Sequence, residues 1–128
     1  MRKSLYGLLL VTCLAISTAG AQQIIVPPYL QPGNASNLTR ERKVLIWHTD
    51  SIPADYKVEF GIGTKVEGME KPSTAKITFV QLKVYNSPTL LYRAQLTGLK
   101  FDEVYSYRVS RNGITIAESS FKTRTKKP

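Results

Sequence analysis

The stretch that most constrains the fold is LTGLKFDEVYSYRV, residues 96–109. A glycine and a charged segment signal a turn, and Tyr105, Tyr107 and Val109 then alternate along one face, as a half-buried β-strand requires. Leu99 at the turn, followed six residues later by Tyr105, is typical of the tyrosine corner of a β-sandwich. In that arrangement a buried ring uses its hydroxyl to bond the backbone of the preceding connection. The stretch therefore predicts architecture and carries no chemistry of its own.

The remaining chain has the pattern of short strands separated by turn signals about every 8–12 residues. The clearest central strand is 43–49, where Leu45 and Trp47 share a face and the indole is expected to fill the space between two sheets. We predict an all-β, two-sheet antiparallel sandwich of the fibronectin type III or immunoglobulin-like type, with about seven strands. The expected strands are 24–32, 43–49, 56–61, 75–85, 90–97, 104–111 and 114–123.

Four stretches of the chain carry further expectations. Two prolines make 24–32 an edge strand, because proline cannot donate to a sheet ladder. Asn112-Gly113 predicts a tight hairpin, whereas 64–70 is expected to be a weak, polar edge segment. The inward side chains of 75–85 stay open between two sets, and a bulge could let the strand use both in turn. The sets are Ile77 with Phe79, and Val80 with Leu82 and Val84.

Residues 1–21 have the organisation of a signal peptide. Arg2 and Lys3 provide the positive start, residues 8–16 form the apolar run, and Ala19-Gly20-Ala21 matches an A-x-A cleavage site before Gln22. The run is shorter than the roughly 20 residues that a membrane-spanning helix needs. The sequence predicts export to a periplasmic or extracellular location and no membrane span.

Cys13, the only cysteine, lies within that apolar run. Its surroundings faintly resemble a lipoprotein cleavage box, but Thr12 before the cysteine is atypical and the apolar run continues past it. The sequence favours cleavage after Ala21 over lipidation. The mature chain would then have 107 of the 128 residues and no cysteine, so its core alone would hold it together.

Removal of Arg2 and Lys3 lowers the formal net charge from +9 to +7. Such an excess can attract nucleic acid, anionic glycans or an acidic surface. The charges are scattered, however, apart from the group at 122–127, which favours a solvated exterior and no nucleic-acid partner. Residues 124–128 are interpreted as a basic tail or a truncated linker. The triplets at Asn34 and Asn37 match the N-glycosylation pattern, and the sequence leaves their use open.

The residues needed for catalysis are scarce. His48 is the single histidine, and the mature chain lacks cysteine, which excludes the usual zinc sites and a Cys–His nucleophile. Only Asp102 and Glu103 adjoin among the acids, and no G-x-S-x-G elbow occurs. We predict that the chain is not an enzyme by itself and has no catalytic, cofactor-binding or metal-binding residues.

Tyrosines are numerous for a domain of this size and could form a ligand-binding stripe. Most fall at inward strand positions, so packing in the core is the favoured interpretation. Tyr29 and Tyr85 are the least committed of the six outside the leader: Tyr29, Tyr56, Tyr85, Tyr92, Tyr105 and Tyr107.

Several motifs together resemble one family, the N-terminal domain of purple acid phosphatases and related metallophosphoesterases. That domain is a fibronectin type III-like sandwich, and the resemblance covers residues 26–123. One departure is Phe101, where such corners commonly carry proline. The motifs are Pro28-Tyr29-Leu30-Gln31, Val44-Leu45-Ile46-Trp47, Val58-Glu59-Phe60-Gly61, Leu96-Thr97-Gly98-Leu99, Tyr105-Ser106-Tyr107-Arg108-Val109 and Ser120-Phe121-Lys122-Thr123.

The resemblance implies an accessory role. In that family the metal-dependent hydrolysis belongs to a second domain, whose ligand motifs have no counterpart here. The chain is therefore expected to be a fragment of a split or truncated gene, or a stand-alone secreted module. The expected partner is a metallophosphatase domain; the alternative is an independent module that binds an extracellular protein or glycan. Four residues are given structural roles only: Trp47, Leu99, Tyr105 and Tyr107.

Overall fold

Eight strands and one short helix make up the part of the chain that the computed structural model describes, residues 22–32, 40–84 and 86–126. The expectations for the leader, for Cys13, Asn34 and Asn37, and for Tyr85 lie outside these residues. The elements are β1 (Ile24–Pro32), β2 (Glu41–Asp50), β3 (Tyr56–Ile62), the 3₁₀ helix η1 (Val66–Gly68), β4 (Glu70–Thr74), β5 (Lys76–Val84), β6 (Ser87–Leu99), β7 (Val104–Arg111) and β8 (Ile114–Lys122).

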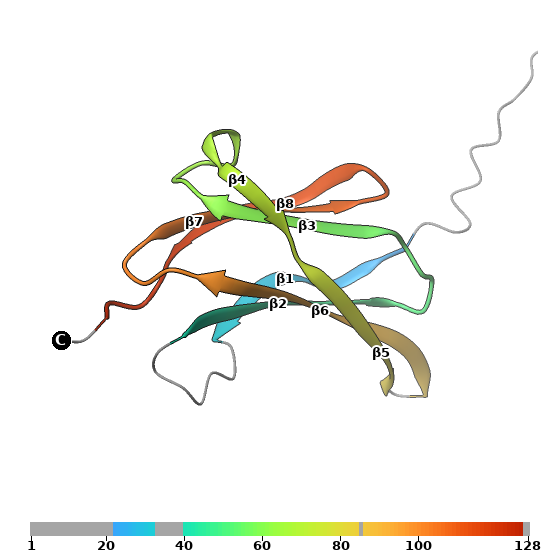
Figure 1. The fold of residues 1–128 in the computed structure, drawn as a ribbon. Coiled ribbons are helices and arrows are strands. Elements are labelled where there is room, and N and C mark those ends of the chain that lie inside the picture. The colour runs from blue at the N-terminus through green and yellow to red at the C-terminus, as the bar shows by residue number, and fades with distance from the viewer. Residues whose placement is uncertain (1–21, 33–39, 85, 127–128) are drawn as a thin grey trace, which may run out of the picture.

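The strands form two antiparallel sheets that pack face to face, as Figure 1 shows. The lower sheet in that view has the order β1-β2-β6-β5, and the upper sheet has the order β4-β3-β7-β8. The prediction of an all-β, two-sheet antiparallel sandwich is confirmed, with eight strands in place of about seven. The eighth strand is β4, which the sequence did not predict; the segment 64–70, expected to be a weak edge segment, instead contains η1, and β4 begins only at its last residue.

The core follows the alternation of the strands. Leu45 and Trp47 of β2 are fully buried between the sheets, and Val58 of β3 and Val109 of β7 meet them from the opposite layer. Ile46 points away from this core, yet it too is buried; Tyr29 and Arg93 lie opposite it on the neighbouring strands.

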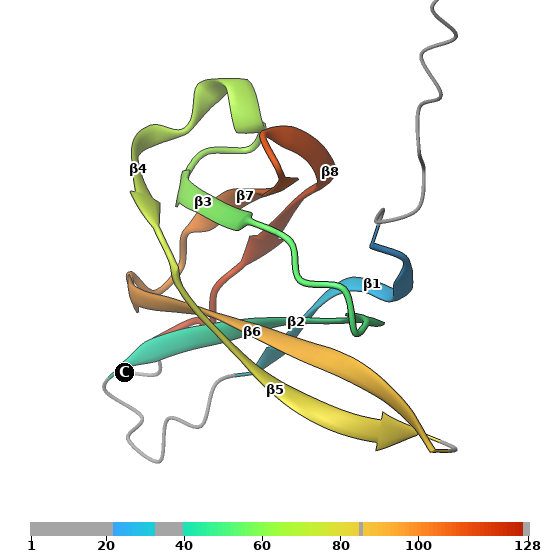
Figure 2. The ribbon, with the colours of Figure 1, turned by 90° about the vertical axis from the view of Figure 1, so that its right-hand side faces the viewer.

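β4 and β5 are nearly one continuous strand that passes from one sheet to the other. Glu59 of β3 pairs with Thr74 at the end of β4, whereas β5 pairs only with β6. Between them, Ala75 donates its backbone N–H to the carbonyl of Val58 at 2.9 Å. Figure 2 shows this passage from the upper layer to the lower one. A strand that switches sheets in this way closes one side of a sandwich.

The open question about the inward side chains of β5 has a geometric answer. Its nine residues pair with β6 without a register shift, so the bulge considered from the sequence is absent from the described strand. Ile77 and Phe79 lie opposite Ala94 and Tyr92 on the core side, whereas Val80 lies on the outer face. Because β5 is the last strand of its sheet, most of its side chains on both faces stay exposed.

Candidate functional site

Tyr105 lies at the corner between β6 and β7. Its hydroxyl accepts a hydrogen bond from the backbone N–H of Lys100 at 2.8 Å, which is the geometry of a tyrosine corner. Its ring stacks on Phe121 with centroids 5.8 Å apart. Thr123 closes the corner from the other side, since its hydroxyl donates to the Lys100 carbonyl at 2.6 Å and accepts from Glu103 N–H at 2.9 Å. These contacts hold the connection between β6 and β7 in place. The hydroxyls of Tyr105 and Thr123 are used for hydrogen bonds to the backbone, so their role is structural.

Trp47, Tyr56 and Tyr92 form an aromatic cluster at the opposite end of the sandwich core. The indole stacks on Tyr92 with centroids 5.4 Å apart, and Tyr56 is tilted against both rings at 5.0 and 4.7 Å. Offset and tilted contacts of this kind are the favoured arrangements of aromatic rings. The Trp47 indole N–H is buried without a hydrogen-bond partner among the described residues. Of the tyrosines considered for a ligand stripe, Tyr92 is thus a buried core residue, and Tyr56 is partly buried against the core.

Gln22, the first residue that the structure describes, is only 6% exposed and caps this cluster. Its side-chain oxygen accepts from the Tyr56 hydroxyl, and its Nε2 donates to the Ile52 carbonyl at 2.5 Å and to the Tyr92 hydroxyl at 3.3 Å. Arg111 Nη1 donates to the backbone carbonyl of Gln22 at 2.8 Å. A buried amide is tolerated when its donors and acceptor are all used, as they are here.

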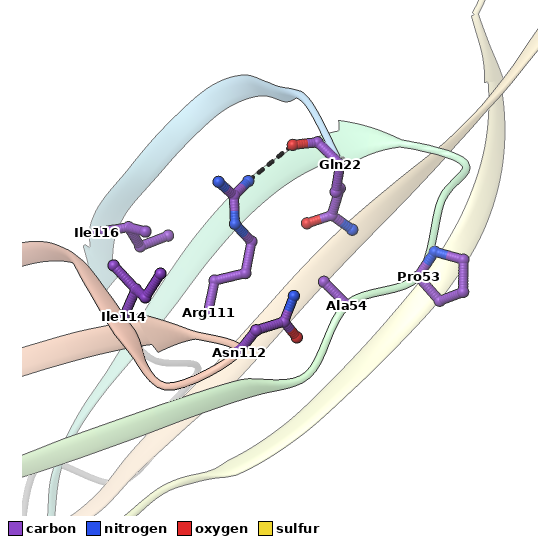
Figure 3. Close-up of a pocket in the computed structure, with 7 residues that line it drawn as sticks. All are labelled: Gln22, Pro53, Ala54, Arg111, Asn112, Ile114 and Ile116. Atoms are coloured by element: carbon purple, nitrogen blue, oxygen red, sulfur yellow. Dashed lines mark hydrogen bonds between the residues drawn. The ribbon is translucent and has the colours of Figure 1, made fainter. Parts of the chain in front are cut away.

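A pocket of about 190 Å3 opens beside this residue. Figure 3 shows Gln22 and Arg111 joined by their hydrogen bond on one side and Asn112 below them. Asn112 exchanges two bonds with Asp55, donating its N–H at 2.7 Å and accepting from Asp55 N–H at 3.0 Å. The lining is completed by Pro53, Ala54, Ile114 and Ile116. The polar groups named here already form hydrogen bonds within the protein. The bond from Arg111 to Gln22 connects the end of β7 to the residue just before β1, and no ligand is needed to satisfy it.

Burial is the main influence on the pKa of the Tyr56 hydroxyl. It raises the pKa of Tyr56 above the ordinary value of 10.0, although the nearby charge of Arg111 acts in the opposite direction. The phenol therefore stays protonated at neutral pH and acts as a hydrogen-bond donor to Gln22. This role is structural, since a general base would need a pKa near the working pH.

The chemistry available in this part of the chain is limited. Residues 22–32, 40–84 and 86–126 contain no cluster of three or more His, Cys, Asp or Glu side chains placed to hold a metal ion. His48 lies on the outer face of β2, where its Nε2 is 2.7 Å from the Thr89 hydroxyl. Asp102 and Glu103 adjoin in the tight turn before β7, where Asp102 has a φ of 57°.

The four residues given structural roles do not converge on one site. Trp47 belongs to the aromatic cluster, whereas Leu99 and Tyr105 make the corner and Tyr107 packs against Phe121 within β7 and β8. Sequence reasoning missed Gln22 as an anchor. Its one signal was its position directly after the A-x-A motif, and nothing in a single glutamine indicates burial.

Comparison with protein families gives a match. The family model described as "Purple acid Phosphatase, N-terminal domain" matches residues 31–123. No curated protein matches the sequence. Within the described residues, no helix is long and apolar enough to cross a membrane. Because the match covers well over half of the chain and includes the corner and both sheets, the resemblance is confirmed, and the chain belongs to the family of purple acid phosphatase N-terminal domains.

Proposed function

We propose that this chain is an exported accessory domain of the fibronectin type III type that docks against a metallophosphatase domain and does not hydrolyse phosphate esters itself. The observation that carries the proposal is the family match over residues 31–123. The sheet orders support the finer assignment: the first, second, sixth and fifth strands share one sheet, and the third, seventh and eighth share the other. That is the order of an immunoglobulin-like sandwich with an added edge strand.

The outer face of the lower sheet is the docking surface that we favour. Val26 of β1 lies opposite His48 of β2, and His48 lies opposite Leu91 of β6, so these side chains form one row across the sheet. Tyr29 of β1 adds an exposed ring opposite the buried Ile46, which lies two residues before His48 in β2. Apolar side chains that stay exposed on an outward sheet face, here Val26 and Tyr29 beside the polar His48 and Arg93, are typical of a surface covered by another domain.

The anchoring of Gln22 supports the proposal of export. Cleavage after Ala21 would leave this residue at the new N-terminus, with its side chain held by Tyr56 and Tyr92 and its carbonyl by Arg111. The domain would therefore keep all of these contacts after the leader is removed. Intact mass of the exported protein tests this: a mass that starts at Gln22 supports cleavage there, and a lipid adduct on Cys13 would refute it.

The catalytic part of the proposal is tested with the purified mature chain, a generic phosphomonoester, and added iron, zinc or manganese. We expect no turnover above the buffer control. Sustained turnover that follows the protein through purification would overturn the non-catalytic assignment.

The docking part needs a partner: a purple acid phosphatase catalytic domain produced without its own N-terminal domain. We expect calorimetry to detect binding, and Tyr29→Asp to weaken it because the substitution places a charge on the proposed contact surface. Ile114→Asp is the control, since Ile114 is also a large exposed hydrophobic residue but lies on the other sheet. Absence of binding, or equal loss with both variants, would refute docking through this face.

A further inference from the structure

The two sheets end in four edge strands, and three of them carry features that hinder pairing with another strand. β1 contains Pro27 and Pro28 and has two register shifts. β4 has only five residues, one of them Pro72. β8 has a register shift against β7 next to Val109. Prolines, bulges, short length and charged side chains, lysine above all, are devices by which natural edges avoid further pairing.

Of these devices, β5 carries only lysines, Lys76 and Lys83, near its two ends. It is nine residues long, KITFVQLKV, contains no proline, and keeps a regular register along its whole length. One of its sides pairs with β6, and the other is the end of the sheet, as Figure 2 shows for the lower layer. The backbone groups on that side have the spacing that an added antiparallel strand requires.

The side chains of β5 are apolar and exposed on both faces. Phe79 on the core side is 58% exposed, and Val80, Leu82 and Val84 on the outer side are 52%, 40% and 39% exposed. Long edges with apolar side chains on both faces attract a further strand, because the added strand buries both faces and completes the ladder together.

We propose that this strand is a homodimer contact: β5 of a second copy of this chain pairs with it antiparallel, around a two-fold axis at Val80. Val80 is the midpoint of the strand, so this register pairs all nine residues and joins two four-stranded sheets into one sheet of eight. Each residue then lies opposite one from the same face. The pairs are Val80 with Val80, Phe79 with Gln81, Thr78 with Leu82, Ile77 with Lys83, and Lys76 with Val84.

The positions of the two lysines in β5 favour this antiparallel register between two copies of the chain. Lys76 and Lys83 lie near the two ends and on opposite faces of the strand. In the antiparallel pairing each lysine lies opposite an apolar residue of the second copy. A parallel, in-register pairing would instead place each lysine against its own counterpart, which is destabilising. Since the strand can pair with a second copy of itself over all nine residues without placing lysine against lysine, a two-fold contact between identical chains fits it, and such contacts are the commonest in oligomers.

The test is sedimentation equilibrium of the full purified chain. We expect a concentration-dependent dimer for the native sequence. Val80→Lys places two like charges against each other at the axis and should raise the dimer dissociation constant at least about tenfold. Ile114→Lys is the control, because Ile114 is 70% exposed and apolar but belongs to β8; this variant should dimerise like the native chain. A native chain that stays monomeric up to about 1 mM, the range of weak complexes, would overturn the proposal.

A charge-swap experiment tests the axis itself. Val80→Lys and Val80→Glu should each be monomeric, and their equimolar mixture should form a heterodimer, because residue 80 meets its own counterpart only in the proposed register. Failure of the mixture to associate, with native dimers present, would refute that register. Circular dichroism checks that the variants are folded. Should Val80→Lys not fold, Leu82→Lys on the same face must weaken the dimer, since its counterpart Thr78 also lies near the axis.

Discussion

Arg124 donates two hydrogen bonds to the buried carboxylate of Glu41, 83 residues earlier in the chain. Its backbone N–H reaches Glu41 Oε2 at 2.7 Å and its Nε reaches the same oxygen at 3.1 Å. The guanidinium also donates to the Arg40 carbonyl at 2.7 Å and lies over the Phe101 ring, 5.6 Å from its centroid. The segment interpreted as a basic tail or linker thus begins with a residue that is bound to the start of β2 and to the corner.

We predict that Glu41→Gln lowers the free energy of unfolding by about 1–2 kcal/mol. Hydrogen bonds to a charged group are worth about 1.5–3 kcal/mol, and the partly exposed Arg124 side chain places this pair at the lower end. Urea unfolding of both proteins measures the difference. Glu118→Gln is the control, because Glu118 pairs with Arg108 at the exposed surface at 3.3 Å and should cost at most about 0.5 kcal/mol. Equal costs for the two variants would contradict the prediction.

The same pair predicts how stability depends on acid. Burial alone would raise the pKa of the Glu41 carboxyl, but the bonds from Arg124 and the charge of Lys43 lower it below the ordinary value of 4.5. A carboxyl with a lowered pKa in the folded state contributes its stability above the unfolded pKa, and this contribution is lost as the pH falls through the folded value. The native chain and Glu41→Gln should therefore differ at pH 6 and converge as the pH falls below 4.5 and through the lower pKa of folded Glu41. A gap that stays constant with pH would show that ionisation of Glu41 is not involved.

The tyrosine corner gives a second prediction. Tyr105→Phe removes the acceptor of the Lys100 N–H and should lower the free energy of unfolding by about 1–2 kcal/mol. Tyr107→Phe is the matched control, because Tyr107 lies two residues along the same strand, is similarly buried and packs on the same Phe121 ring, but does not make the corner bond. Thermal or urea unfolding of the two variants separates the corner bond from the loss of a phenolic oxygen in general. The corner would be energetically unimportant if both changes cost the same.

Local patterns were sufficient to predict seven of the eight described strands and their packing in two sheets, but not β4. Alternation placed Trp47, Val58 and Val109 in the core, and Asn112-Gly113 marked the hairpin, where φ is 50° and 82°. The inward residues of β5 could not be chosen in the same way. Both faces of this strand are apolar, and its exposure depends on its position at the end of the sheet, which only the pairing of distant strands decides.

The sequence also could not predict which isolated polar residues are buried in the fold. Glu41 was one of several isolated acids, and Gln22 had no motif that signalled burial. Each becomes a buried anchor only because the fold brings a partner to it, Arg124 for Glu41 and the two tyrosines of the aromatic cluster for Gln22. Contacts between residues so far apart in sequence leave no local pattern.

Gly61 in β3 is predicted to be intolerant of a side chain for reasons of space. A Cβ there would lie 2.9 Å from the Glu70 carbonyl oxygen and 3.3 Å from Pro72 Cα, both backbone atoms of β4. Gly61→Ala should force β4 away from β3 and cost about 1–3 kcal/mol. Gly68→Ala is the control, since nothing lies within 4 Å of its Cβ position. Chemical denaturation compares them, and a neutral Gly61→Ala would show that the two strands can separate without cost.

Gln22→Ala tests whether the first described residue holds the sandwich together. The change leaves the hydroxyls of Tyr56 and Tyr92 without their amide partner in a largely buried place, and unpaired buried groups cost about 1–3 kcal/mol each. We expect a loss of about 2 kcal/mol in the free energy of unfolding, measured on the mature chain. The neighbour Gln23→Ala is the control: Gln23 is exposed, so its side chain should contribute at most about 0.5 kcal/mol. If the two alanine variants are equally stable, the contacts of Gln22 follow from the fold and do not secure it.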